Sequence, residues 1–136
     1  MVKPIVRDVF FLSRPSVPAT AADLPVARDL LDTLQANADR CVGMAANMIG
    51  VNKNIIVFTA DHSTTVMFNP TITAKGKRYE TEEGCLSLDG VRKCVRYENI
   101  EVSYRDITWK VQKRRYSGWA AEIIQHEIDH LSGIII

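Results

Sequence analysis

Two histidines near the end of the sequence constrain its fold more than any other feature. His126 and His130 stand four residues apart in the segment QHEIDHLSG, with Glu127 beside the first of them. On a helix, successive residues advance by about 100°, so the two imidazoles share a face while the carboxylate lies on its flank. Only LSGIII follows His130, so a third protein ligand for a metal ion has to come from earlier in the chain.

The candidates for this third ligand are His62 and three cysteines, Cys41, Cys85 and Cys94. The context EEGCLSLDG favours Cys85, because Gly84 lets the backbone approach closely. A thiolate and two imidazoles leave one position of the ion open, as catalytic sites do. The alternative for Cys85 is a small buried hydrophobic residue, and we assign Cys41 and Cys94 to that role.

The alternative for the histidine pair is a polar helix face with solvated side chains. Against this, the motif is surrounded by apolar residues that would place it in or near a core: Ile123, Ile124, Ile128 and Leu131. A metal ion that lowers the pKa of a water, beside a carboxylate base, is the arrangement that hydrolysis requires. The segment therefore predicts a hydrolytic metal site.

Length and charge fit one globular domain over residues 1–136. The chain is 46% hydrophobic and 24% charged, and 17 basic against 16 acidic residues give a net charge of +1. Such a balance argues against a protein that coats DNA or an anionic membrane. We expect no signal peptide or transmembrane run. Three cysteines without disulfide spacing favour a reducing compartment, so the predicted location is the cytoplasm.

The hydrophobic pattern predicts an α+β fold, in which mostly antiparallel strands pack around a C-terminal helix that carries the histidines. We expect an amphipathic helix within residues 20–40 and buried strands at 54–60 and 65–73. A polar connection is expected at 81–90. Ile100, Val102 and Tyr104 alternate with polar residues, which predicts a half-buried strand.

The last elements of the chain are predicted to be a hairpin strand and the metal helix. Residues 109–116 are expected to return as the partner of the preceding strand. The helix is expected from Gly118 to about Leu131, with Ser117 placed to cap it and Gly133 placed to stop it.

Three segments together resemble the peptide deformylase family. VGMAAN, EGCLS (Glu83–Ser87) and QHEIDH (Gln125–His130) occur in the family's order, the second and third intact. The similarity extends over nearly the whole chain, far beyond a lone H-E-x-x-H. It implies the peptide deformylase fold and removal of the formyl group from formyl-methionine at the start of nascent bacterial or organellar proteins, with release of formate.

The resemblance also implies the roles of the central residues. Cys85, His126 and His130 would bind the metal, typically Fe²⁺, with Zn²⁺, Ni²⁺ or Co²⁺ as substitutes. Glu127 would take a proton from the attacking water and pass it to the leaving amine. The backbone N–H of Leu86 would face the negative charge that develops on the formyl oxygen.

Other residues are implied to bind the formyl-Met peptide. The backbone of Val42, Gly43 and Gly84 would pair with the peptide as an added strand, and Arg92 would steady it. An apolar pocket, partly lined by the helix of His126, would receive the methionine side chain.

The first motif departs from the family pattern Gly-x-Gly-x-Ala-Ala-x-Gln. Cys41 stands at the first glycine, and Met48 stands at the glutamine whose amide donates to the developing oxyanion in the family. Methionine has no donor, and loss of one such donor costs about 10²–10³ in rate. We therefore expect a slower deformylase than members with the glutamine. Asn47 could substitute only if the backbone were rotated.

Two further functions stay open from the sequence. Met48 motivates a deformylase-like metalloprotein that binds N-terminal peptides with low or no turnover. A structural zinc module would need Cys94 or Cys41 as a fourth ligand, and would leave Glu127 without a purpose. The basic run Lys110–Arg115 could contact ribosomal RNA, although such runs are more often the solvated face of a hairpin.

Overall fold

A computed structural model describes residues 1–85 and 87–134 of the chain. Within these ranges, one antiparallel sheet has its strands in sequence order: β1 (Gly43–Ala45), β2 (Ile55–Ala60), β3 (Ser63–Cys85), β4 (Leu88–Arg105) and β5 (Val111–Ser117). The helices there are α1 (Val9–Leu12), η1 (Ala21–Asp23), α2 (Leu24–Ala36), η2 (Ala46–Ile49) and α3 (Gly118–Leu131). None of these helices is long and apolar enough to cross a membrane.

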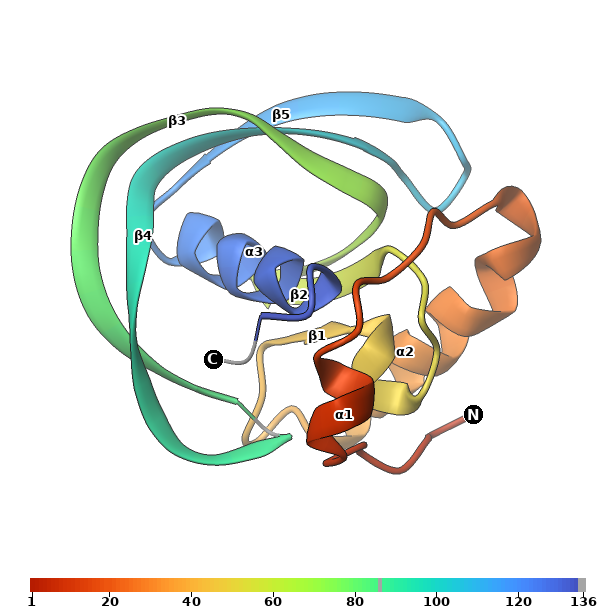
Figure 1. Cartoon of the computed structure of the whole chain (residues 1–136). Coiled ribbons are helices and arrows are strands. Elements are labelled where there is room, and N and C mark those ends of the chain that lie inside the picture. The colour runs from red at the N-terminus through yellow and green to blue at the C-terminus, as the bar shows by residue number, and fades with distance from the viewer. Residues whose placement is uncertain (86, 135–136) are drawn as a thin grey trace.

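The long ribbon of β3 and β4 curls around α3 (Figure 1). Their pairing is interrupted by register shifts near Phe68, Ile72 and Gly84. Irregularities of this kind bend strands and increase their twist. The bending carries the far end of β3, with Cys85, to the side of α3 that bears the histidines.

The strand β2 shows how the sheet is buried on both of its faces. Ile55 and Val57 pack into a core with α2 and η2, whereas Ile56 and Phe58 pack into a second core with α3. Successive side chains of a strand point to opposite faces, so a continuous apolar run is expected where both faces are covered. The sheet therefore separates two cores and holds α3 on one of them.

Several predicted elements are confirmed, and one is wrong. The alternating residues Ile100, Val102 and Tyr104 are buried, and β5 pairs with β4 as the predicted hairpin partner. The polar connection expected at 81–90 is instead the end of β3 and the start of β4. This stretch is held by backbone pairing along the ribbon, and its buried side chains, Glu83 and Ser87, are polar, so burial left no apolar pattern in its sequence.

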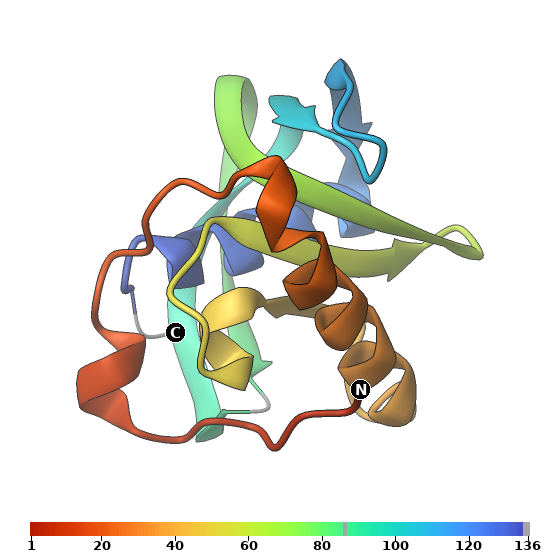
Figure 2. The ribbon, with the colours of Figure 1, turned by 90° about the vertical axis from the view of Figure 1, so that its right-hand side faces the viewer.

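The C-terminal end of α3 is fixed by its own turn and by the N-terminal part of the chain. The amide of Ile134 donates to the Asp129 carbonyl, and the amide of Gly133 to the His130 carbonyl, each at 3.0 Å, which is a Schellman ending. Gly133 has the left-handed φ of 78° that this ending requires. The amide of Ser16 donates to the Leu131 carbonyl at 2.7 Å, where the segment between α1 and η1 passes the end of the helix (Figure 2).

We expect Gly133→Ala to lower the free energy of unfolding by about 1–3 kcal/mol, since a non-glycine residue at positive φ is strained. A Cβ at this position would also overlap the backbone carbonyl oxygen of Ser13. The measurement is urea unfolding, with Gly76→Ala as the control, because a Cβ there meets no atom of the described residues within 4 Å. Equal stability of the two variants would contradict a role for Gly133 in ending the helix.

Candidate active site

Three predicted metal ligands come together at the junction of β3 and α3. The ligand atoms of Cys85, His126 and His130 lie within 4.8 Å of one another. No further His, Cys, Asp or Glu of the described residues joins this group. Cys41 and Cys94, both half-buried, remain outside it, so the described residues do not form the closed four-ligand zinc site.

The donor set and its spacing fit one metal ion. The Nε2 atoms of His126 and His130 are 2.9 Å apart. Two nitrogens that each bind an ion at about 2.1 Å are separated by roughly 3–3.5 Å in tetrahedral geometry. A small increase in the distance between the two Nε2 atoms is therefore enough for an ion to bind between the two imidazoles and the Cys85 thiol.

Glu127 lies beside this group and is 4% exposed. Its Oε1 atom is buried without a hydrogen-bond partner among the residues that the structure describes. The backbone of β1 passes so closely that a Cβ on Gly43 would lie 3.0 Å from the Oε2 atom of Glu127 and 2.7 Å from Cγ2 of Ile123. The glycine thus permits the close approach of β1 to the carboxylate.

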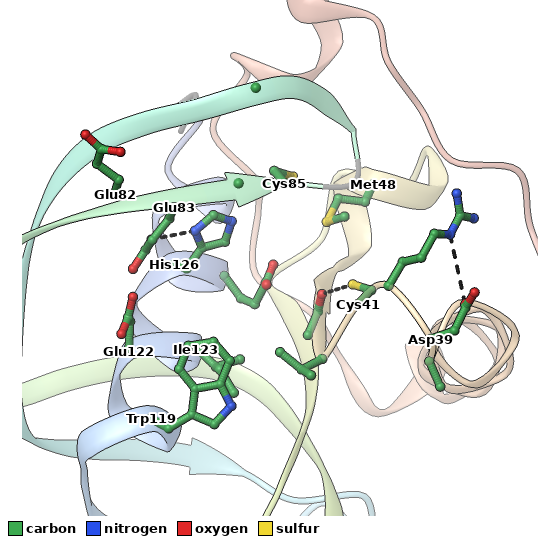
Figure 3. Close-up of a pocket in the computed structure, with 17 residues that line it drawn as sticks. Asp39, Cys41, Met48, Glu82, Glu83, Cys85, Trp119, Glu122, Ile123 and His126 are labelled. Carbon is green, nitrogen blue, oxygen red and sulfur yellow. Dashed lines mark hydrogen bonds and ion pairs between the residues drawn. The ribbon is translucent and has the colours of Figure 1, made fainter.

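An open cavity of about 610 Å³ gives access to the site (Figure 3). Its walls are the segment from Ala38 to Gly43, the end of β3 and one face of α3. Val42, Gly43 and Gly84, which are predicted to bind the substrate, line it, and so does Met48. The face of α3 is not wholly apolar, because Glu122 lines the cavity together with the apolar residues Trp119 and Ile123.

The structure does not bring the predicted residue Arg92 into this cavity. Arg92 is not among the described residues that line it, and its Nη1 atom donates to the Asp89 carbonyl at 3.3 Å. Leu86, predicted to offer its backbone N–H, lies outside the described residues. Their roles stay predictions.

Met48 and its neighbour Asn47 lie in η2, directly after β1. Met48 is 1% exposed, and its sulfur accepts a hydrogen bond from the Ala45 amide at 3.5 Å. Asn47 is fully buried, and its side-chain amide donates to the His130 carbonyl at 2.9 Å. The amide of Asn47 is therefore engaged elsewhere and does not replace the glutamine of the family.

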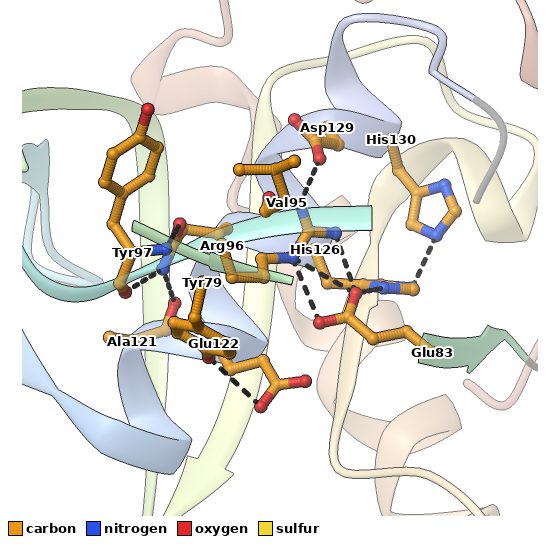
Figure 4. A network of polar contacts seen from close by, with 11 residues as sticks. Tyr79, Glu83, Val95, Arg96, Tyr97, Ala121, Glu122, His126, Asp129 and His130 are labelled. Carbon is orange, nitrogen blue, oxygen red and sulfur yellow. Dashed lines mark hydrogen bonds and ion pairs between the residues drawn. The ribbon is translucent and has the colours of Figure 1, made fainter. Parts of the chain in front are cut away.

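A buried chain of charged groups, which the sequence did not predict, lies behind the ligands (Figure 4). Oε1 of Glu83 accepts a hydrogen bond from Nδ1 of His126 at 2.7 Å. Arg96 donates to Glu83 through Nε and Nη2, the latter at 2.7 Å, and through Nη1 to Asp129 at 2.7 Å. A carboxylate on Nδ1 fixes the tautomer and orientation of a ligand histidine, so Nε2 of His126 faces the site.

Ligand histidines commonly bond to carboxylates. The position of Glu83 two residues before Cys85 could therefore have indicated one member of this charged network from the sequence. Arg96 stands in VRKCVRY, where nothing distinguishes it from an exposed strand residue.

Burial and these contacts shift the pKa values of the site in opposite directions. Burial lowers the pKa of His126, but its bonds to Cys85 and Glu83 outweigh this and raise it to about 10. Burial and the charge of His126 lower the pKa of His130 to about 3.

The two carboxylates of the site are also shifted apart. Burial raises the pKa of Glu127 to about 7. Burial acts in the same direction on Glu83, but its bonds to His126 and Arg96 prevail and hold its pKa well below the usual range. Glu83 is thus a fixed anion, whereas Glu127 is a group that can exchange a proton near neutral pH.

A thiol and two imidazoles, a buried carboxylate beside them and an open cavity are together the features of a metal-dependent hydrolase. Comparison with known proteins refines this class. The chain matches the family model for polypeptide deformylase over residues 11–136. A peptide deformylase of Clostridium beijerinckii is 55% identical over 136 residues, the whole of both chains. The chain therefore belongs to the polypeptide deformylase family.

A more distant relative is longer than this chain. The peptide deformylase of Picosynechococcus sp. is 39% identical over 117 residues, which are 81% of this chain and 62% of that relative. The chain thus spans less than two thirds of the length of that protein.

Solved structures agree with the predicted fold. A peptide deformylase from Legionella pneumophila has a TM-score of 0.89 at 31% identity, covering 99% of this chain and 83% of that one. A Met-Ala-Ser-bound peptide deformylase from Acinetobacter baumannii has a TM-score of 0.89 at 27% identity, covering 99% and 96%. A third, from Synechococcus elongatus in complex with actinonin, has a TM-score of 0.87 at 30% identity, covering 98% and 75%.

We expect Cys85→Ala to abolish stoichiometric binding of Co²⁺ and the thiolate-to-metal absorption band, because one of three ligands is lost. Cys94→Ala should retain both, since Cys94 is not in the ligand group. The measurement is Co²⁺ titration followed by absorption and by metal analysis after desalting. Retention of the thiolate band in Cys85→Ala would show that another cysteine is the ligand.

Proposed function

We propose that this chain removes the formyl group from formyl-methionyl peptides of nascent proteins in the bacterial cytoplasm, with Fe²⁺ as the resident ion. The observation that carries the proposal is the position of buried Glu127 beside the group of Cys85, His126 and His130, with Cys85, His126 and Glu127 lining one open cavity. The family membership of the chain supports the same reaction. Zn²⁺, Ni²⁺ and Co²⁺ suit the same ligands.

Cys85, His126 and His130 would hold the ion. When bound, the ion would supply a Lewis acid that polarises the formyl carbonyl and lowers the pKa of a water molecule. Glu83 would keep the His126 ring oriented through its bond to Nδ1.

Glu127 would carry the proton during hydrolysis. Its Oε1 atom has no partner among the described residues, so it is free to accept a proton from the attacking water. The same carboxyl would then donate this proton to the nitrogen of the peptide as the C–N bond of the formamide breaks. The products would be formate and a peptide with a free amine.

The free edge of β1 would bind the peptide backbone. β1 is an end strand of the described sheet and pairs with β2 on one side only. Gly43 of β1 and Gly84 at the end of β3 both line the cavity. An extended peptide could add to such an edge through main-chain hydrogen bonds, and Gly43 would bring its formyl end close to Glu127.

We expect Glu127→Gln to lower kcat for a formyl-Met tripeptide by about 10²–10⁴, the usual contribution of a general base. Metal content should not change, because Glu127 is outside the group of three ligands. The measurement is formate release with metal analysis of the same samples, and Glu98→Gln, at an exposed position on β4, is the control. Full activity of Glu127→Gln would exclude Glu127 as the base.

We expect Met48→Gln to raise kcat by up to about 10²–10³, because it restores an amide donor toward the developing oxyanion. Met48→Leu should leave the rate unchanged, since neither side chain has a donor. Steady-state formate release by the two variants checks this. An unchanged or lower rate in Met48→Gln would contradict the role given to position 48.

Met48 is also the one observation that favours the alternative, a deformylase-like protein that binds N-terminal peptides with little turnover. Formate release by anaerobically purified, iron-loaded wild-type protein separates the two. Turnover supports the enzyme, and its absence with a fully occupied site supports the binding protein.

Contact with the ribosome stays a weaker proposal. In the basic run on β5, Lys113 and Arg115 each lie 3.5 Å from carboxylate oxygens of Glu101, so part of its charge is balanced within the protein.

A further inference from the structure

The side chain of Asn47 connects the first motif with the metal helix. It is 0% exposed, and its Nδ2 atom donates to the backbone carbonyl of His130 at 2.9 Å across 83 positions of sequence. A buried hydrogen bond between such distant segments fixes their relative position, because breaking it leaves polar groups unsatisfied. Asn47 is thus tied to the backbone of a residue in the ligand group.

The carbonyl that it contacts lies in the last turn of α3. The last four carbonyls of a helix have no partner within the helix and depend on capping contacts. Here Gly133 caps the His130 carbonyl and Ser16 caps the Leu131 carbonyl, while Asn47 adds a side-chain donor to His130. Because His130 is in this terminal turn, the direction of its imidazole depends on how firmly the turn is held.

We propose that Asn47 is a positioning residue of the metal site. It holds the last turn of α3 so that Nε2 of His130 stays directed at Nε2 of His126 and at Cys85. The proposal rests on the proposed function, in that these three residues bind the ion. The first motif would then have two roles. Met48 lines the cavity, and Asn47 sets the position of the ligand residue His130.

The test compares Asn47→Leu with Asn37→Leu. Asn37 is a matched control, because its Nδ2 atom donates at 2.8 Å to the Thr33 carbonyl at the end of another helix, α2. Both substitutions remove an amide–carbonyl bond and keep a side chain of similar size. The readouts are the dissociation constant for Zn²⁺, by competition with a chelator, and the ligand-field absorption of the Co²⁺ form.

Asn47→Leu should raise the dissociation constant by about 10–100-fold, as loss of contacts that orient metal ligands usually does. It should also change the Co²⁺ spectrum, whereas Asn37→Leu should change neither. Equal constants and spectra for the two variants would overturn the proposal and leave Asn47 a purely structural residue. Failure of the wild type to bind the ion would instead overturn the ligand assignment itself.

A second measurement needs no substitution, in case Asn47→Leu does not fold. In the wild-type protein, the side-chain NH₂ signals of Asn47 should be protected from solvent exchange and should shift when Zn²⁺ is added. The NH₂ signals of Asn37 should not shift. Signals of Asn47 that exchange fast or ignore Zn²⁺ would contradict a link between this amide and the ligand turn.

Discussion

The arrangement of the site depends on the buried carboxylate of Glu83. It lies between the guanidinium of Arg96 and the imidazole of His126, so it joins β3, β4 and α3 at one point. Burying a carboxylate is costly unless it is paired and hydrogen-bonded, and these two partners offset that cost. Loss of Glu83 would free Nδ1 of His126 and leave Arg96, 3% exposed, with Asp129 as its remaining acidic partner among the described residues. Ligand orientation and the closure of the ribbon on α3 are therefore coupled.

The segment of β1 and η2, which holds the first motif, contacts the metal site through two residues. Gly43 lets β1 run next to Glu127, and Asn47 holds the helix turn of His130. Met48 follows Asn47 in η2, and its sulfur accepts a hydrogen bond from the Ala45 amide. The methionine at this position therefore offers no hydrogen-bond donor to the cavity.

Much of the fold and the ligand set could be predicted, because the relevant residues leave local patterns. The helix of His126 and His130 has apolar neighbours at helical spacing, and Cys85 follows a glycine in a distinctive segment. The end of β3 and the start of β4 could not be read, because their form comes from pairing with each other and their buried side chains, Glu83 and Ser87, are polar. Arg96 and Asn47 form hydrogen bonds with residues that are distant in sequence and are brought near only by the folded topology. No local sequence pattern therefore predicts these hydrogen bonds.

X-ray absorption spectroscopy of the Zn²⁺-loaded protein tests the central claim most directly, since it identifies the ligand atoms of the bound ion. The structure predicts one sulfur and two imidazole nitrogens as the protein ligands, from Cys85, His126 and His130. A second sulfur, which would have to come from Cys41 or Cys94, would contradict the open three-ligand site. A spectrum without sulfur would remove Cys85 from the site altogether.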